Sequence, residues 1–161
     1  MSDARSYESE VYAFQHLGFE CIKTECELMS ELGYCRVPEG IFWDCKNRYK
    51  VSVEVKRLIG NELPREGKSR RIVRRRKSII WPWTSTVESA IEKAHPKITD
   101  LFTIEMHHVV FVVPEQLSAK SFRRLHQHIN EVASRFMNYT TIGVPVSVHI
   151  IKGPSTLFDR F

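Results

Sequence analysis

The sequence has no long hydrophobic run. None of its apolar stretches approaches the ~18 to 20 residues that a membrane-spanning helix needs, and residues 1–20 lack the basic-then-apolar pattern of a secretory signal. Internal repeats and low-complexity tracts are also missing, apart from one basic run. These absences predict an intracellular, cytoplasmic protein.

Closely paired cysteines are missing as well. The four cysteines fall in one quarter of the chain, and their separations match no C-x-x-C pair or zinc ribbon. They are Cys21, Cys26, Cys35 and Cys45. In a reducing cytosol the simplest interpretation is four free thiols. A zinc or iron-sulfur site on them is disfavoured, because soft-metal sites show closer pairing.

The length and composition fit one globular domain. A chain of 161 residues with 42% hydrophobic and 27% charged residues is long enough to bury one core. The net charge is +5, but one segment carries eight cations against a single Glu66: Arg65, Lys68, Arg70, Arg71, Arg74, Arg75, Arg76 and Lys77. Such a run favours nucleic acid, because arginine matches phosphate oxygens and neutralised phosphates release counterions. The alternative is a solvated loop.

Hydrophobic spacing predicts an α/β fold with one mixed central sheet flanked by helices. Helices are expected over residues 5–17, from a Ser85-x-x-Glu88 capping box to an interruption at Pro96, and over residues 119–139. Strands are expected over 19–26, 39–44, 49–58, 107–113 and 145–153, and residues 27–37 are either an excursion or the lead into a strand. The domain then spans residues 1–161, with a basic insertion at about 60–83.

The residues around the second and third expected strands form the most informative stretch. Two extended runs flank the polar "CKNR", which predicts a β-hairpin. If the turn lies at Lys46 and Asn47, Glu54 lies beside Glu39 or Pro38. Because side chains alternate along a strand, Glu54 and Lys56 share the face opposite the valines of the same strand.

Two converging carboxylates raise each other's pKa unless a cation lies between them. Oxygen ligands without a histidine or cysteine pair suit Mg²⁺ or Mn²⁺, so we predict that Glu39 and Glu54 bind such an ion. Lys56 would then position or deprotonate a water and offset charge on a phosphate. The alternative is an ordinary ion pair between Glu54 and Lys56 on an exposed strand, and Asp44 is expected to be a turn residue.

These motifs resemble the PD-(D/E)XK nuclease superfamily, which includes restriction endonucleases and Holliday-junction resolvases. The resemblance rests on Pro38-Glu39, on Glu54-Val55-Lys56, on an acidic first helix and on an αβββαβ order, and it covers residues 5–151. It implies a restriction endonuclease-like αβββαβ core with an added C-terminal helix and strand.

The resemblance also implies roles for individual residues. Glu39 and Glu54 would hold the metal, Lys56 would be the motif lysine, and Glu8 on the first helix would complete the site, with Glu10 as its alternative. The superfamily usually has aspartate at the first position, and Glu39 is longer by one methylene. This departure keeps a second interpretation open, in which the fold is catalytically inactive and binds nucleic acid or a protein partner.

The sequence and the resemblance together predict a metal-dependent nuclease that hydrolyses phosphodiester bonds, with DNA favoured over RNA. The basic run would grip the nucleic-acid backbone, and a homodimer or larger complex is compatible with this function.

Trp81 and Trp83 would either stack on an unpaired base or pin the basic insertion to the fold. His107 and His108 face opposite ways on a strand, and we expect them either to have their ring nitrogens hydrogen-bonded within the fold or to lie at the edge of the sheet. Lys93 and Lys97 are further candidates for the substrate channel.

Overall fold

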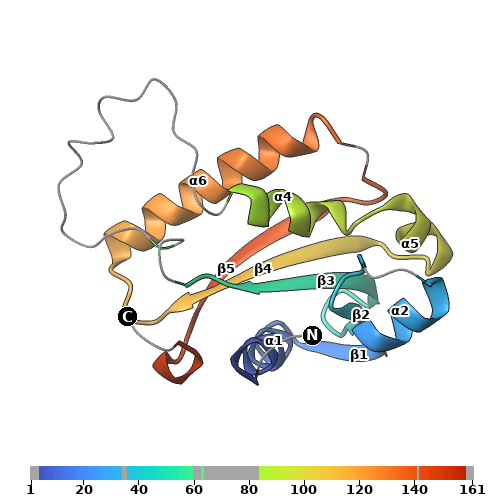
Figure 1. Ribbon diagram of the computed structural model, residues 1–161, viewed down its shortest axis with the longest axis horizontal. Helices are drawn as coiled ribbons and strands as arrows, with labels where there is room; N and C mark the ends of the chain where they lie inside the picture. The colour runs from blue at the N-terminus through green and yellow to red at the C-terminus, as the bar shows by residue number, and fades with distance from the viewer. Residues whose placement is uncertain (1–3, 34–35, 60–62, 64–83, 141, 159–161) are drawn as a thin grey trace.

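The centre of the protein is a five-stranded mixed sheet (Figure 1). The computed structural model describes residues 4–33, 36–59, 63, 84–140 and 142–158. The strands lie in chain order: β1 (Phe19–Thr24), β2 (Gly40–Asp44), β3 (Tyr49–Arg57), β4 (Met106–Pro114) and β5 (Val146–Gly153). β1, β2 and β3 pair antiparallel, whereas β3, β4 and β5 pair parallel. The predicted α/β class with a single mixed sheet flanked by helices is confirmed.

Helices cover both faces of this sheet. They are α1 (Ala4–Leu17), α2 (Glu25–Leu32), α4 (Thr84–Glu92), α5 (Pro96–Leu101) and α6 (Ala119–Met137), with a short 3₁₀ turn, η2 (Ser155–Leu157). α1 and η2 lie on one face, and α4 and α6 lie on the other (Figure 1). Parallel strands need such crossovers, and α6 connects β4 to β5.

Two hydrophobic layers follow from the alternation of side chains along the strands. Val51, Val53 and Val55 of β3 pack on the side of α1, as their spacing predicts. On the other side, Phe111 of β4 packs against α4 and α6. β4 is the strand whose near-continuous apolar run predicts burial on both faces, and from His107 to Pro114 it is buried throughout.

The predicted order of three consecutive strands after the first helix is wrong. Residues 25–32, where the sequence left an excursion open, form α2 between β1 and β2. Thr24 caps this helix, because its side chain accepts a hydrogen bond from the N–H of Glu27 while the Glu27 carboxylate accepts one from the Thr24 N–H. This reciprocal cap ends β1 at Thr24, although the extended pattern continues to Cys26.

The predicted capping box at Ser85 is also wrong. α4 begins at Thr84, so Ser85 lies inside the helix, where its backbone is unable to adopt the extended conformation of a cap. The interruption at Pro96 is confirmed, since Pro96 is the first residue of the separate helix α5 and His95 caps it.

Some predicted features lie outside the described residues. The eight cations of residues 65–77 and the tryptophans at 81 and 83 are among them, as is most of the predicted basic insertion. Within the part of the chain that the structure describes, no helix is both long and apolar enough to cross a membrane.

Asp44 fixes the turn of the β2–β3 hairpin. Its Oδ1 accepts hydrogen bonds from the N–H groups of Lys46 (3.0 Å) and Asn47 (3.1 Å), and its Oδ2 accepts one from the Asn47 side chain (2.8 Å). Arg48 completes the turn with a positive φ of 61°. The predicted role of Asp44 as a turn residue is confirmed, and the turn sets which residues of β2 and β3 face each other.

We predict that Asp44→Ala lowers the free energy of unfolding by about 1–3 kcal/mol, because the backbone N–H groups of the turn lose their hydrogen-bond acceptor. Burial alone would raise the pKa of the Asp44 carboxyl, but the hydrogen bonds from Asn47 and Lys46 outweigh burial and lower it. The stabilisation is therefore present above the ordinary aspartate pKa and is lost as the pH falls below it. Urea denaturation at pH 7 and pH 3 measures both effects. Equal destabilisation at the two pH values would contradict this account.

Candidate functional site

The negative charge of Glu54 acts on the carboxyl of Glu39, so the hairpin brings the two acids close together. The N–H of Glu39, one residue before β2, donates to the Val53 carbonyl at 2.8 Å, and the antiparallel ladder begins at the next residue, where Gly40 pairs with Val53. This is the register that the turn position predicts. β2 begins at Gly40, whereas β3 continues to Arg57, so the two acids lie where the strands part.

Glu54 is a fully buried carboxylate held by two lysines. Its exposed fraction is 0%, and its Oε2 lies 2.7 Å from Lys93 Nζ and 3.4 Å from Lys56 Nζ. Burial raises the pKa of Glu54, while the two ammonium groups act in the opposite direction. The prediction that Glu54 and Lys56 share a face is confirmed. Lys93, which follows the last residue of α4, is the closer partner.

Glu39 is partly buried and carries an unusual pKa. Burial, followed by the negative charges of Glu54, Glu10 and Glu25, raises the pKa of Glu39 from 4.5 to about 9, and the positive charge of Lys93 acts in the opposite direction. These influences place several acidic groups within electrostatic reach of one another. Without a cation, the Glu39 carboxyl holds its proton at neutral pH.

Each of the two acids keeps one carboxylate oxygen that is buried and has no hydrogen-bond partner among the described residues. These atoms are Glu39 Oε2 and Glu54 Oε1. Buried acceptors normally find a donor, because leaving one unpaired costs about 1–3 kcal/mol. Carboxylate oxygens are the ligand type that Mg²⁺ and Mn²⁺ prefer. Across the described part of the chain, no set of three or more histidine, cysteine or acidic side chains is arranged as a complete metal site.

A buried hydrogen-bond chain aligns α4 with β3. Ser52 Oγ lies 2.7 Å from His107 Nδ1, and His107 Nε2 lies 2.9 Å from the Ala90 carbonyl. Because a carbonyl only accepts, His107 donates from Nε2 and its Nδ1 accepts from the Ser52 hydroxyl. Burial lowers the pKa of His107 to about 4, which keeps the ring neutral. His107 is therefore a satisfied histidine, as predicted, and it ties the end of α4 to the strand that carries Glu54.

The two candidate acids of α1 have different positions. Glu8 is exposed, whereas Glu10 is half-buried and lines a cavity of about 760 Å³ together with Glu25 and Glu39. The remaining lining of this cavity is mainly apolar and includes Tyr7, Phe14, Met29 and Phe42. Since the negative charge of Glu10 acts on Glu39, Glu10 is the α1 residue that the structure brings to the acid pair.

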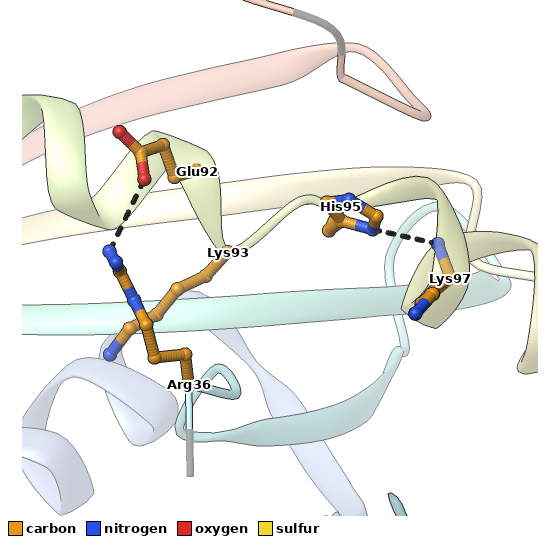
Figure 2. Close-up of a pocket in the computed structure, with 5 residues that line it drawn as sticks. All are labelled: Arg36, Glu92, Lys93, His95 and Lys97. Carbon is orange, nitrogen blue, oxygen red and sulfur yellow. Dashed lines mark hydrogen bonds and ion pairs between the residues drawn. The ribbon is translucent and has the colours of Figure 1, made fainter. Parts of the chain in front are cut away.

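A second, smaller hollow of about 310 Å³ lies on the side of α4 and α5. Arg36, Glu92, Lys93, His95 and Lys97 line it (Figure 2). Lys93 thus borders this hollow and also contacts Glu54. The sequence named Lys93 and Lys97 as candidates for a substrate channel, but it gave no reason to pair Lys93 with Glu54.

The comparisons with known proteins add no relative. No protein-family model, no curated protein and no solved structure matches this chain.

The pKa of Glu39 predicts a dependence of stability on pH. Because the folded-state pKa lies above the unfolded value, the stabilisation present below pH 4.5 is lost as the pH rises towards about 9. We expect Glu39→Gln to remove most of this loss, so that the variant gains stability relative to the native sequence as the pH rises. Urea denaturation in EDTA between pH 5 and pH 9 measures the difference. Parallel pH profiles for the two proteins would contradict it.

Proposed function

We propose that this protein is a metal-dependent nuclease that hydrolyses phosphodiester bonds of nucleic acid, with DNA as the favoured substrate. The observation that carries the proposal is the proximity of Glu39 and Glu54, each with a buried carboxylate oxygen that has no hydrogen-bond partner in the described part of the chain. A protein that only binds polyanions gains nothing from this acidic cluster, in which Glu10 and Glu25 act on Glu39 as further negative charges.

Glu39 and Glu54 would hold Mg²⁺ or Mn²⁺ through these oxygens, with Glu10 as the third acid. A hard divalent cation keeps several waters and binds substrate phosphate oxygens, which polarises the phosphate and lowers the pKa of bound water. The high pKa of Glu39 fits this role, because an ion would replace its proton and relieve the repulsion from Glu54.

Two lysines supply positive charge at the same place. Lys56 is partly exposed, with 37% of its side chain accessible, so its ammonium is able to reach both Glu54 and a substrate. There it would orient the attacking water and offset charge on the phosphate during hydrolysis. Lys93 is more buried and lies closer to Glu54, and it would hold the Glu54 carboxylate in place.

The resemblance to the PD-(D/E)XK nuclease superfamily supports the same function and suggests a restriction endonuclease-like core. The antiparallel hairpin followed by a parallel strand agrees with that architecture, and α2 between the first two strands is an addition to the αβββαβ order. The basic run at residues 65–77 would contact the backbone, which positions nucleic acid without reading its sequence.

The first test is cleavage of linear, branched and single-stranded DNA and of RNA, in Mn²⁺ and in EDTA. We expect cleavage in Mn²⁺ only, with a loss of roughly 10²-fold or more in Glu54→Gln, which weakens metal binding, and in Lys56→Gln, which removes a positive charge that stabilises the reacting phosphate. Lys46→Gln, which removes the same charge from the exposed hairpin turn, should cleave normally. Unchanged cleavage in both site variants would remove the proposed active site.

The second test is calorimetric titration with Mn²⁺ in two buffers of different ionisation enthalpy. We expect binding to release about one proton at pH 7.5, because the ion displaces the proton that Glu39 holds with a pKa of about 9. Glu39→Gln should abolish the release. Glu10→Gln should weaken binding, whereas Glu8→Gln should not, because Glu8 is exposed. Binding without proton release would contradict the assignment of Glu39.

One observation favours a second candidate, an inactive nuclease-like fold that binds nucleic acid or a protein partner. Lys93 already neutralises Glu54 at 2.7 Å, which reduces the need for a metal. Wild-type protein that binds DNA, leaves it intact and takes up no Mn²⁺ would establish this candidate instead.

A further inference from the structure

The small hollow beside α4 and α5 has a chemical character opposite to that of the acidic cavity. Four of its five lining side chains are basic or donate hydrogen bonds, and Glu92 is the one acid. In Figure 2, Arg36 and Lys93 lie on one side of the hollow, and His95 and Lys97 lie on the other. The space of about 310 Å³ between them suits a small, compact ligand.

Glu92 leaves most of this positive charge uncompensated. Its Oε2 accepts from Arg36 Nη2 at 3.2 Å, and both side chains are well exposed, at 44% and 64%. An exposed pair of this kind contributes at most about 1 kcal/mol. The pairing therefore opens easily to an incoming anion. Lys97 is exposed at the first turn of α5, and its ammonium adds to the positive charge.

His95 adds a fixed donor. Its Nδ1 accepts the backbone N–H of Lys97 at 3.1 Å, which is the cap of α5. A ring that accepts at Nδ1 is neutral and carries its proton on Nε2, so its second nitrogen only donates. Arginine and lysine likewise only donate. The ligand that fits a hollow lined by such donors is an anion that only accepts hydrogen bonds, and a phosphate group has this property.

Lys93 connects the hollow to the acid pair. Its Nζ lies 2.7 Å from Glu54 Oε2, and the same side chain lines the hollow. An anion in the hollow would therefore lie next to the place where Glu39 and Glu54 would bind metal. Resting on the proposed function, we propose that Arg36, His95 and Lys97 form a subsite for a phosphate group of the nucleic-acid strand, adjacent to the bond that is cut.

This subsite explains how a strand is placed at an acidic centre. The negative charges of Glu10 and Glu25 beside Glu39 repel phosphate, whereas the cations of the hollow attract it, so a strand is held with one phosphate in the hollow. With a space of about 310 Å³, the subsite takes a single phosphate group of the strand. Shape and charge then position the substrate independently of its bases.

The test uses fluorescence anisotropy of a single-stranded DNA oligonucleotide in EDTA, over a range of salt concentrations. A lost phosphate contact on single-stranded nucleic acid lowers the slope of log K against log salt by about 0.7. We expect that decrease, with weaker binding, for Lys97→Gln. Lys46→Gln removes an equal charge far along the hairpin and should leave the slope unchanged. Glu92→Gln should tighten binding several-fold, because it removes the one opposing acid.

A 5′-phosphorylated oligonucleotide and its 5′-hydroxyl counterpart identify the source of the phosphate. Tighter binding of the phosphorylated strand that disappears in Lys97→Gln assigns a terminal phosphate, and equal binding with the same Lys97 effect assigns an internal one. The subsite would be overturned if Lys97→Gln showed the same salt dependence of binding as Lys46→Gln and if Glu92→Gln bound the oligonucleotide no more tightly than the native protein. Failure of the proposed nuclease gives a different result: the slopes change as expected, but DNA stays intact in Mn²⁺.

Discussion

The structure depends on how one buried carboxylate is neutralised. Glu54 lies on β3 with no exposed surface, and burying an unpaired charge in a protein interior costs several kcal/mol. Lys93 and Lys56 both contact its Oε2, while Oε1 has no hydrogen-bond partner among the residues that the structure describes. Glu39 next to it has its pKa raised to about 9 and holds a proton at neutral pH. Under the proposed function, a divalent ion would compete with this proton.

Several local features of the fold maintain this pair. Asp44 fixes the hairpin turn, the turn fixes the register, and the register brings Glu39, one residue before β2, close to Glu54. On the other side, the Ser52–His107–Ala90 chain holds the end of α4 against β3, which delivers Lys93 to Glu54. His107 is therefore important for the geometry of the site, although it lies outside the acid cluster. The acidic and basic hollows on either side follow from the same placement of α1, α2, α4 and α5.

The sequence predicted the parts of the site that depend on local rules. Strand alternation and the polar turn predicted the proximity of Glu39 to Glu54 and the shared face of Glu54 and Lys56, because both depend on residues close along the chain. The contact between Lys93 and Glu54 depends on how α4 packs on the sheet, and no periodicity encodes that orientation. The choice between Glu8 and Glu10 depends on how α1 is rotated. Helical spacing alone left it open.

The errors also have local explanations. Thr24 and Glu27 carry the signature of a helix cap, but residues 19–26 also have the alternating pattern of a strand. The two patterns overlap, so the sequence does not by itself decide whether a helix begins here. Ser85 and Glu88 carry a similar signature, but Thr84 next to Ser85 is already helical. An S/T-x-x-E pattern thus marks a helix start only where the backbone before it is extended.

The most direct test of the acid pair is the anomalous scattering of a crystal grown with Mn²⁺. The account predicts a peak about 2.1 Å from one oxygen of Glu39 and one oxygen of Glu54, with waters completing the coordination. A crystal with no peak there, in which Glu39 Oε2 and Glu54 Oε1 are satisfied by protein donors, would contradict it.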